Sequence, residues 1–196
     1  MANDDYKSRA KDSTKSFLKW EGYICDRLGL KGFILMDESI ADWAENVDVH
    51  GCDYYGNGYN IQHKKQSTSK IYFEIKYASK ANGNYAFYGE PAKSFLKIDK
   101  ADYFTFDFKD KLYIFNARTL NLVYYFFPSE FDIKVFDKGK KNEKHKGFID
   151  IDKMLKLYNK IMLWQTTGEG GEEILAQRNL SGKWKSIFDE QRENEE

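Results

Sequence analysis

The sequence contains little cysteine or proline and no long apolar run, and these scarcities exclude several classes of protein. Its two cysteines, Cys25 and Cys52, do not form a C-x-x-C pair, so a zinc knuckle is not supported and free thiols are the simpler interpretation. No apolar run approaches the roughly 18 residues of a transmembrane helix. The segment Met1 to Lys15 lacks the apolar region of a signal peptide, so we expect a cytoplasmic protein.

The sequence also lacks net charge, with 31 basic and 31 acidic residues. Proteins that bind nucleic acid without specificity are usually basic overall, so contact with a polyanion would have to come from a local patch. Aromatic residues make up 17% of the chain and prolines number only two, which indicates a packed and regular protein rather than a disordered one.

Hydrophobic periodicity predicts an α/β (α+β) fold with a mixed, largely antiparallel central sheet flanked by helices. The expected helices are Ser13 to Leu28, Pro91 to Ile98 and Asp150 to Trp164, with one or two further turns at Ser39 to Glu45. The expected strands are Phe33 to Met36, Val47 to Gly56, Tyr59 to Gln66, Ile71 to Tyr77, Ala101 to Phe108, Lys111 to Asn116 and Val123 to Phe127. We expect one domain over residues 1–165 and an extension, partly disordered, over residues 166–196.

Candidate site residues gather on the strands around Asn57-Gly58, a dipeptide typical of a two-residue hairpin turn. With that turn, Asp53 lies directly opposite Gln62, and Lys64 projects from the same face. A three-residue turn at Ser67 to Ser69 would bring Glu74 into the same row, with Lys76 beside it. The position of Glu74 depends on that turn, because a shift by one residue turns every side chain to the other face.

Glu21 adds a further carboxylate to the candidate site. At about 100° per residue, it falls inside the apolar stripe that Phe17, Ile24 and Leu28 form on the first helix. An ionised carboxylate in the interior is costly unless it is paired, so we expect a metal, a lysine or a water beside it. Together, these carboxylates and lysines suit a hard divalent cation and an anionic substrate.

These residues, in this order, resemble the PD-(D/E)XK nuclease superfamily, in particular its small phage and bacterial restriction-like or resolvase-like members. The match consists of Glu21 on a helix, Asp53 on a strand and Gln62-His63-Lys64 on the next strand, with Glu74-Ile75-Lys76 as a second half-motif. The segments IYFEIKY, GNYAFYG and ADYFTF also look similar to the family, and the resemblance covers about Thr14 to Leu120. Two departures are Cys52 in place of the proline and Gln62 in place of the acidic residue.

The resemblance implies a Mg²⁺- or Mn²⁺-dependent endonuclease that hydrolyses DNA phosphodiester bonds. Asp53 and the carbonyl of His63 would hold the metal, with Glu21 and Glu74 as further ligands, and Lys64 would orient the attacking water. A rival assignment pairs Asp53 or Asp48 with Glu74 and Lys76. We prefer Gln62 and Lys64, because the Asn57-Gly58 hairpin sets this half-motif opposite Asp53. Asp48 lies an odd number of residues from Asp53, so it points to the other face of a regular strand.

The expected partners are DNA and a second copy of the chain, since nucleases of this kind often dimerise to cut both strands. The residues expected to contact phosphates are Lys65, Lys76, Lys140, Lys141 and Lys144. Gln62 in the acidic position favours an alternative, a noncatalytic module on the same fold that binds nucleic acid or protein. A third interpretation is an inhibitor or adaptor that docks through exposed aromatic residues.

Overall fold

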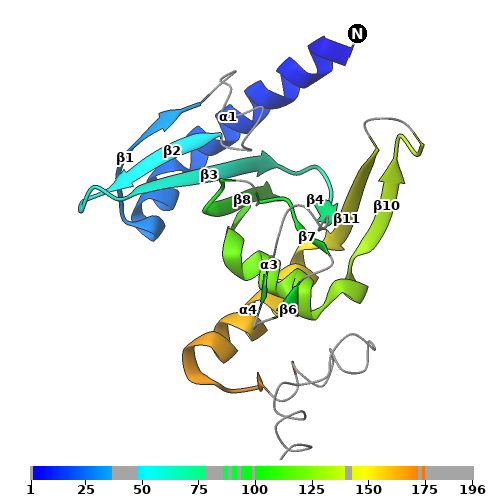
Figure 1. Cartoon of the computed structure of the whole chain (residues 1–196). Helices are drawn as coiled ribbons and strands as arrows, with labels where there is room; N and C mark the ends of the chain where they lie inside the picture. Colours follow the sequence, from blue (N-terminus) through cyan, green and yellow to red (C-terminus); the bar gives the residue numbers. More distant parts are fainter. Residues whose placement is uncertain are drawn as a thin grey trace, which may run out of the picture. The chain divides into compact units, whose positions relative to one another are not determined.

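The fold of the chain is α+β, as the hydrophobic periodicity predicts (Figure 1). The computed structural model describes residues 2–36, 48–77, 86–87, 90–91, 94–98, 100–139, 143–171 and 174. One unit consists of Met1–Ile71 with Lys97–Leu120, and the other of Tyr72–Leu96 with Asn121–Glu196. The helical turns predicted at Ser39 to Glu45 lie outside the described residues. The predicted boundary between residues 165 and 166 stays a prediction.

The first unit contains a mixed sheet with the strand order β1-β2-β3-β8-β9. Its strands are β1 (Leu30–Leu35), β2 (Val49–Asp53), β3 (Gly58–Lys65), β8 (Tyr103–Phe108) and β9 (Lys111–Asn116). β3 and β8 run parallel, whereas β1–β2, β2–β3 and β8–β9 are antiparallel. The predicted mixed and largely antiparallel sheet is therefore confirmed.

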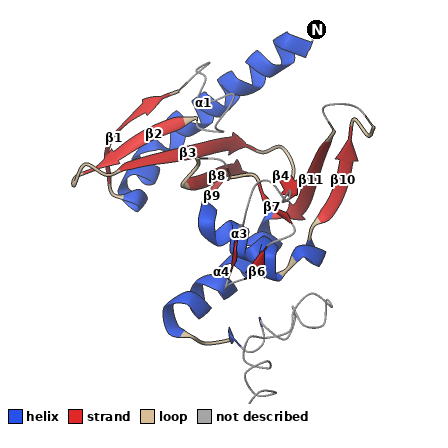
Figure 2. Ribbon diagram, in the orientation of Figure 1, coloured by secondary structure: helices blue, strands red, loops and turns tan. Residues whose placement is uncertain are grey.

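The helix α1 (Ala2–Leu28) covers one face of this sheet, along β1 and β3 (Figures 1 and 2). Phe17 and Ile24 of α1 are buried in one cluster with Val49 of β2 and Ile61 of β3. Val49 and Ile61 are register partners, so both point toward the helix. Residues next to them in sequence point to the opposite face, and this alternation decides where the candidate site residues project.

The β8–β9 hairpin closes with a tight turn between the two strands predicted at Ala101 to Phe108 and Lys111 to Asn116. Lys109 and Asp110 have φ angles of 49° and 57°, and Phe108 pairs with Lys111. Two central residues with positive φ are the feature of the turn type whose twist matches that of the strands. The turn places Asp110 near the face covered by α1, where its carboxylate accepts a hydrogen bond from Lys19 over 2.6 Å.

A second sheet has the strand order β10-β11-β4-β7 and lies in the second unit, apart from the first two residues of β4. Its strands are β4 (Lys70–Tyr77), β7 (Ser94–Leu96), β10 (Asp132–Phe136) and β11 (Lys144–Asp150). β5 (Ala86–Phe87) and β6 (Glu90–Pro91) form a separate pair, and α3 (Ala117–Phe126) leads into the short helix η1 (Pro128–Glu130). The predicted helix at Asp150 to Trp164 is confirmed as α4 (Ile151–Thr167), whose first turn is capped by the Asp150 carboxylate. No helix in the described ranges has a stretch long and apolar enough to cross a membrane.

Two predicted elements are wrong. The segment Val123 to Phe127, predicted as a strand, lies largely within α3, where residues 119–127 are buried on every side. A helix buried all round has no polar face, so its periodicity cannot separate it from a buried strand. The segment Pro91 to Ile98, predicted as a helix, contains the end of β6 and the strand β7.

Asn121 of α3 holds the edge strand β7 by its backbone. Its Oδ1 accepts a hydrogen bond from the Leu96 N–H over 2.7 Å, and its Nδ2 donates to the Leu96 carbonyl over 3.4 Å. We expect Asn121→Ala to lower the free energy of unfolding by about 1–3 kcal/mol, because it leaves buried backbone groups unpaired. Urea unfolding measures this loss, and Asn159→Ala on the exposed side of α4 is the matched control. Equal losses in the two variants would contradict this role.

Candidate functional site

The β2–β3 hairpin has a different register from the predicted one. Cys52 pairs with Gly58 and Gly51 with Tyr59, so Asp53 to Asn57 form a five-residue loop rather than Asn57-Gly58 a two-residue turn. The predicted opposition of Asp53 and Gln62 is therefore wrong. The shift is by an odd number of residues, which reverses the face relationships across the hairpin.

Asp53 organises the loop through its carboxylate. Its Oδ1 accepts hydrogen bonds from the backbone N–H groups of Tyr55 (2.9 Å) and Asn57 (2.8 Å), and its Oδ2 from the Asn57 amide (2.8 Å) and the Tyr59 hydroxyl (3.2 Å). The hydrogen bond from the Asn57 side chain is the largest of the causes that lower the pKa of Asp53. An aspartate that bonds backbone groups two residues ahead is a turn-forming residue, and this role competes with a continued strand.

We expect Asp53→Ala to loosen the loop and to leave unchanged the metal-dependent cleavage that the family resemblance predicts. The substitution removes acceptors of the Tyr55 and Asn57 N–H groups but touches neither Gln62 nor Lys64. Hydrogen exchange should become faster at these two amides, while the rate of metal-dependent DNA cleavage stays at the wild-type level. Loss of cleavage in a folded Asp53→Ala protein would restore the original assignment.

Asp48 is the carboxylate that the structure brings to Gln62. Its Oδ2 accepts hydrogen bonds from Gln62 Nε2 over 2.5 Å and from the His63 backbone N–H over 2.6 Å. Asp48 precedes Val49, so it points away from α1 and toward the same side as Gln62. Asp48 and Asp53 point to opposite faces of the strand, as their odd separation predicts. The residue that shares the face of Gln62 is Asp48 and not Asp53.

The side-chain oxygen of Gln62 is buried and has no hydrogen-bond partner among the described residues. A carboxylate accepts hydrogen bonds, so the Gln62 nitrogen faces Asp48 and donates to it. The Gln62 oxygen is therefore the side-chain atom that is left without a partner. An unpaired buried oxygen costs free energy that a cation or a water would recover. Carboxylate and amide oxygens belong to the class of ligands that Mg²⁺ takes, and this ion keeps several waters. No group of three or more His, Cys, Asp or Glu side chains suited to a metal occurs in the part of the chain that the structure describes.

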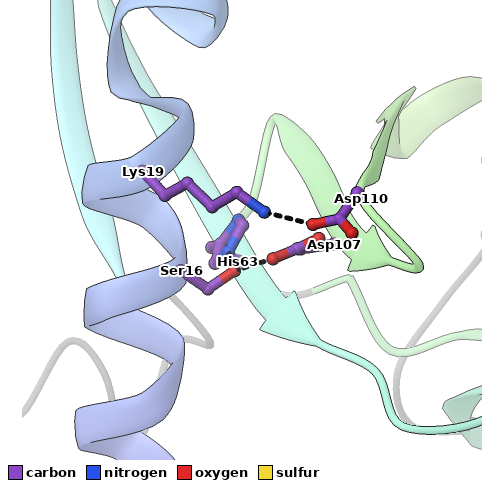
Figure 3. Close-up of polar contacts among 5 residues, drawn as sticks. All are labelled: Ser16, Lys19, His63, Asp107 and Asp110. Carbon is purple, nitrogen blue, oxygen red and sulfur yellow. Dashed lines mark hydrogen bonds and ion pairs between the residues drawn. The ribbon is translucent and has the colours of Figure 1, made fainter.

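Beneath this pair, on the α1 face, the His63 ring belongs to a buried polar network (Figure 3). Its Nδ1 lies 2.7 Å from the Thr105 hydroxyl, and its Nε2 lies 2.9 Å from the Ser16 hydroxyl of α1. Ser16 donates its proton to Asp107 Oδ2 over 2.7 Å. His63 Nε2 must therefore donate to Ser16, and Thr105 must donate to Nδ1, which is the tautomer of a neutral imidazole.

Burial lowers the pKa of His63 to about 4, against an attraction from Asp107 that raises it. The ring is 1% exposed and lies edge-on to Phe17, with the ring centres 5.7 Å apart. The His63 imidazole is consequently neutral at neutral pH. Since Ser16 comes from α1 and Thr105 from β8, the ring ties β3 to both neighbours.

Anchoring of His63 on one face determines how its sequence neighbours project. Gln62 and Lys64 flank it on β3, so both point to the face opposite α1. Gln62 is 7% exposed and Lys64 is half-buried. The half-motif Gln62-x-Lys64 thus has its two side chains on one face, as predicted, with Asp48 as the adjacent carboxylate.

Two other predicted members of the site lie elsewhere. Glu74 belongs to β4 in the second sheet, so its predicted place in the row beside Gln62 is wrong, and its carboxylate pairs with Lys76 over 3.1 Å. The other edge of β3 is occupied by β8, which leaves no place there for β4. Glu21 is exposed, because the buried side of α1 runs through Ser16 and Trp20 rather than through Glu21.

The described lysines among the predicted phosphate contacts lie on three different strands. Lys65 is exposed on β3, Lys76 is exposed on β4 and Lys144 is exposed on β11. Lys140 and Lys141 lie outside the described residues. The metal ligation predicted for the carbonyl of His63 stays a prediction.

Sequence reasoning missed the residues of the buried network, which are Ser16, Thr105 and Asp107. A usable signal exists for two of them. In the segment Tyr103 to Phe108 every position is apolar except Thr105 and Asp107, which are two residues apart and so share a face. Polar residues in an otherwise apolar strand need buried partners, and the pattern predicts a polar contact there.

Comparisons of the chain with protein-family models, with curated proteins and with solved structures found no match. The resemblance to the PD-(D/E)XK superfamily therefore stays a prediction that rests on the residues themselves.

Proposed function

We propose that the chain is a metal-dependent endonuclease that hydrolyses DNA phosphodiester bonds at a site formed by Asp48, Gln62 and Lys64. The observation that carries the proposal is the Gln62 side chain. Its nitrogen donates to the Asp48 carboxylate, and its buried oxygen has no hydrogen-bond partner among the described residues, on the strand face from which Lys64 projects. Mg²⁺ or Mn²⁺ is the proposed cofactor.

The residues divide the work by their chemistry. Asp48 and Gln62 supply a negative and a neutral oxygen ligand, so a divalent cation held there keeps positive charge to polarise a phosphate. The Lys64 ammonium can hold the attacking water and attract the phosphate anion. Water attacks the phosphorus and releases one of its protons to solvent, and the bond from phosphorus to one bridging oxygen breaks. That oxygen takes up a proton from solvent and leaves as a hydroxyl group, so one water molecule is consumed for each bond that is cut. A homodimer would supply the second site that a double-strand cut needs.

Gln62 also supports a second candidate, a noncatalytic nucleic-acid-binding module. An amide is a weaker metal ligand than a carboxylate, and a site with one carboxylate retains a cation less strongly. Such a module would bind DNA without cutting it.

Incubation with plasmid, single-stranded and branched DNA, in Mg²⁺, Mn²⁺ or EDTA, separates the two candidates. The endonuclease proposal predicts cleavage of at least one substrate that EDTA abolishes. Binding without cleavage in either metal would support the module instead.

A further inference from the structure

The outer face of the second sheet combines aromatic rings with lysines. Lys134 pairs directly with Lys146 across β10 and β11, and Phe136 pairs with Lys144. Directly opposed residues share a face, and Phe148 follows Lys146 on that face of β11. The Tyr72 ring of β4 lies 5.5 Å from the Phe148 ring, so it joins the same surface. Asp132 pairs with Phe148, so its carboxylate lies on the same face. We call this surface the lysine–aromatic face, and its members are Tyr72, Asp132, Lys134, Phe136, Lys144, Lys146 and Phe148.

The rings form a row that solvent reaches. Phe148 lies in the middle, with its ring centre 6.2 Å from that of Phe136 and 5.5 Å from that of Tyr72. Phe136 is 41% exposed on the edge strand β10, and every residue of β10 is exposed. On β11, Gly147 and Ile149 are buried and point the other way, which shows that this unit's core lies on the opposite side of the sheet.

Three lysines and the one carboxylate of Asp132 leave these residues with an excess of positive charge, in a chain that has none overall. Lys146 Nζ lies 4.3 Å from the Tyr72 ring centre and 5.1 Å from the Phe136 ring centre, and Lys134 Nζ lies 5.3 Å from that of Phe148. Lys134 also pairs with Asp132 over 3.5 Å. Neither Lys144 nor Lys146 forms an ion pair with a carboxylate of the described ranges. Their positive charge is available to an anion.

We propose that the lysine–aromatic face binds single-stranded nucleic acid, with bases stacked on Phe136, Phe148 and Tyr72 and phosphates held by the lysines. Aromatic rings beside a positively charged track are the features that single-strand binders use, because every base has a face that stacks. A duplex hides those faces, so it would use only the lysines. A protein partner fits less well, since lysine is depleted in protein–protein interfaces. The binding needs neither a metal nor cleavage, so it goes beyond the nuclease proposal.

The test is fluorescence anisotropy of the full chain with labelled DNA and RNA oligonucleotides of about 16 nucleotides, in EDTA. We expect both single strands to bind more tightly than the corresponding duplex. Phe136→Ala should weaken binding roughly 5- to 140-fold, the loss of one stacked base. Val135→Ala is the matched control, because Val135 is 43% exposed on the same strand and points to the other face.

Salt dependence tests the lysines separately. Lys144→Ala and Lys146→Ala should each reduce the slope of log affinity against log salt by about 0.7, the value for one phosphate contact in a single strand. Lys156→Ala, on the exposed side of α4, should leave the slope unchanged. Wild-type affinity in folded Phe136→Ala and Lys146→Ala proteins, or equal affinity for duplex and single strand, would overturn the proposal. Asp48→Asn should bind like the wild type, so a failure of cleavage and a failure of binding are distinguishable.

Discussion

Replacing Lys64 with alanine should lower the maximal rate of metal-dependent DNA cleavage about 10²- to 10⁴-fold, the range for a side chain that handles the proton or water of the attacking group. The side chain is half-buried on the face of β3 opposite α1, two residues from the buried Gln62. Its loss removes the ammonium from the face where Asp48 and Gln62 would provide the proposed oxygen ligands. Single-turnover cleavage at saturating DNA and Mn²⁺ measures the effect on the chemical step.

The matched control is Lys65→Ala. Lys65 is the next residue on β3, carries the same charge, is exposed and points to the opposite face. Loss of a phosphate contact at Lys65 would change only the DNA concentration needed for saturation, so the maximal rate should stay at the wild-type value. Equal reductions in the two variants would show that Lys64 contributes only general charge.

Acidification should destabilise the protein through His63. The pKa of this imidazole is about 4 in the folded chain, because of burial, and 6.5 is its ordinary value. Between these values the unfolded chain binds a proton that the folded chain does not, so stability falls as the pH decreases from 6.5 toward 4. At about 1.4 kcal/mol for each pKa unit, the full loss at His63 is about 3 kcal/mol.

Urea unfolding at a series of pH values measures this loss. Carboxylates also titrate between pH 6.5 and 4. We therefore compare the loss of unfolding free energy in the wild type with the loss in His63→Gln, which lacks the imidazole. The difference between the two losses is the contribution of His63. An NMR titration of the wild-type imidazole provides a second measurement that needs no variant. A His63 ring that protonates near pH 6.5 in the folded protein would contradict the buried network.

The fold class could be predicted because it depends on periodicity. The strand Ile71 to Tyr77 alternates cleanly, and the Lys109-Asp110 turn matches its flanking strands, so both elements were found within one or two residues. Val123 to Phe127 could not be assigned, because an element buried on all sides shows no period. Pairing partners were also hidden, since β3 pairs with β8, a strand distant in sequence, and not with β4.

The candidate site was predicted in part. Gln62 and Lys64 share a face in any strand, whatever the pairing, because they are two residues apart. Which carboxylate lies beside them depends on the length of the β2–β3 loop. Asp53 bonds the Tyr55 and Asn57 amides and so lengthens the loop, which brings Asp48 to Gln62 instead. The propensity of Asn-Gly for a tight turn was outweighed by these hydrogen bonds to Asp53.

Plasmid nicking by the wild type, Asp48→Asn and Asp53→Asn in Mn²⁺, with EDTA as the blank, tests the proposed site most directly. Both substitutions remove one negative charge and keep the size of the side chain, so they differ only in position. The proposed site predicts EDTA-sensitive nicking by the wild type and by Asp53→Asn, and its loss in Asp48→Asn. Nicking by Asp48→Asn at the wild-type rate, or none by any of the three proteins, would contradict it.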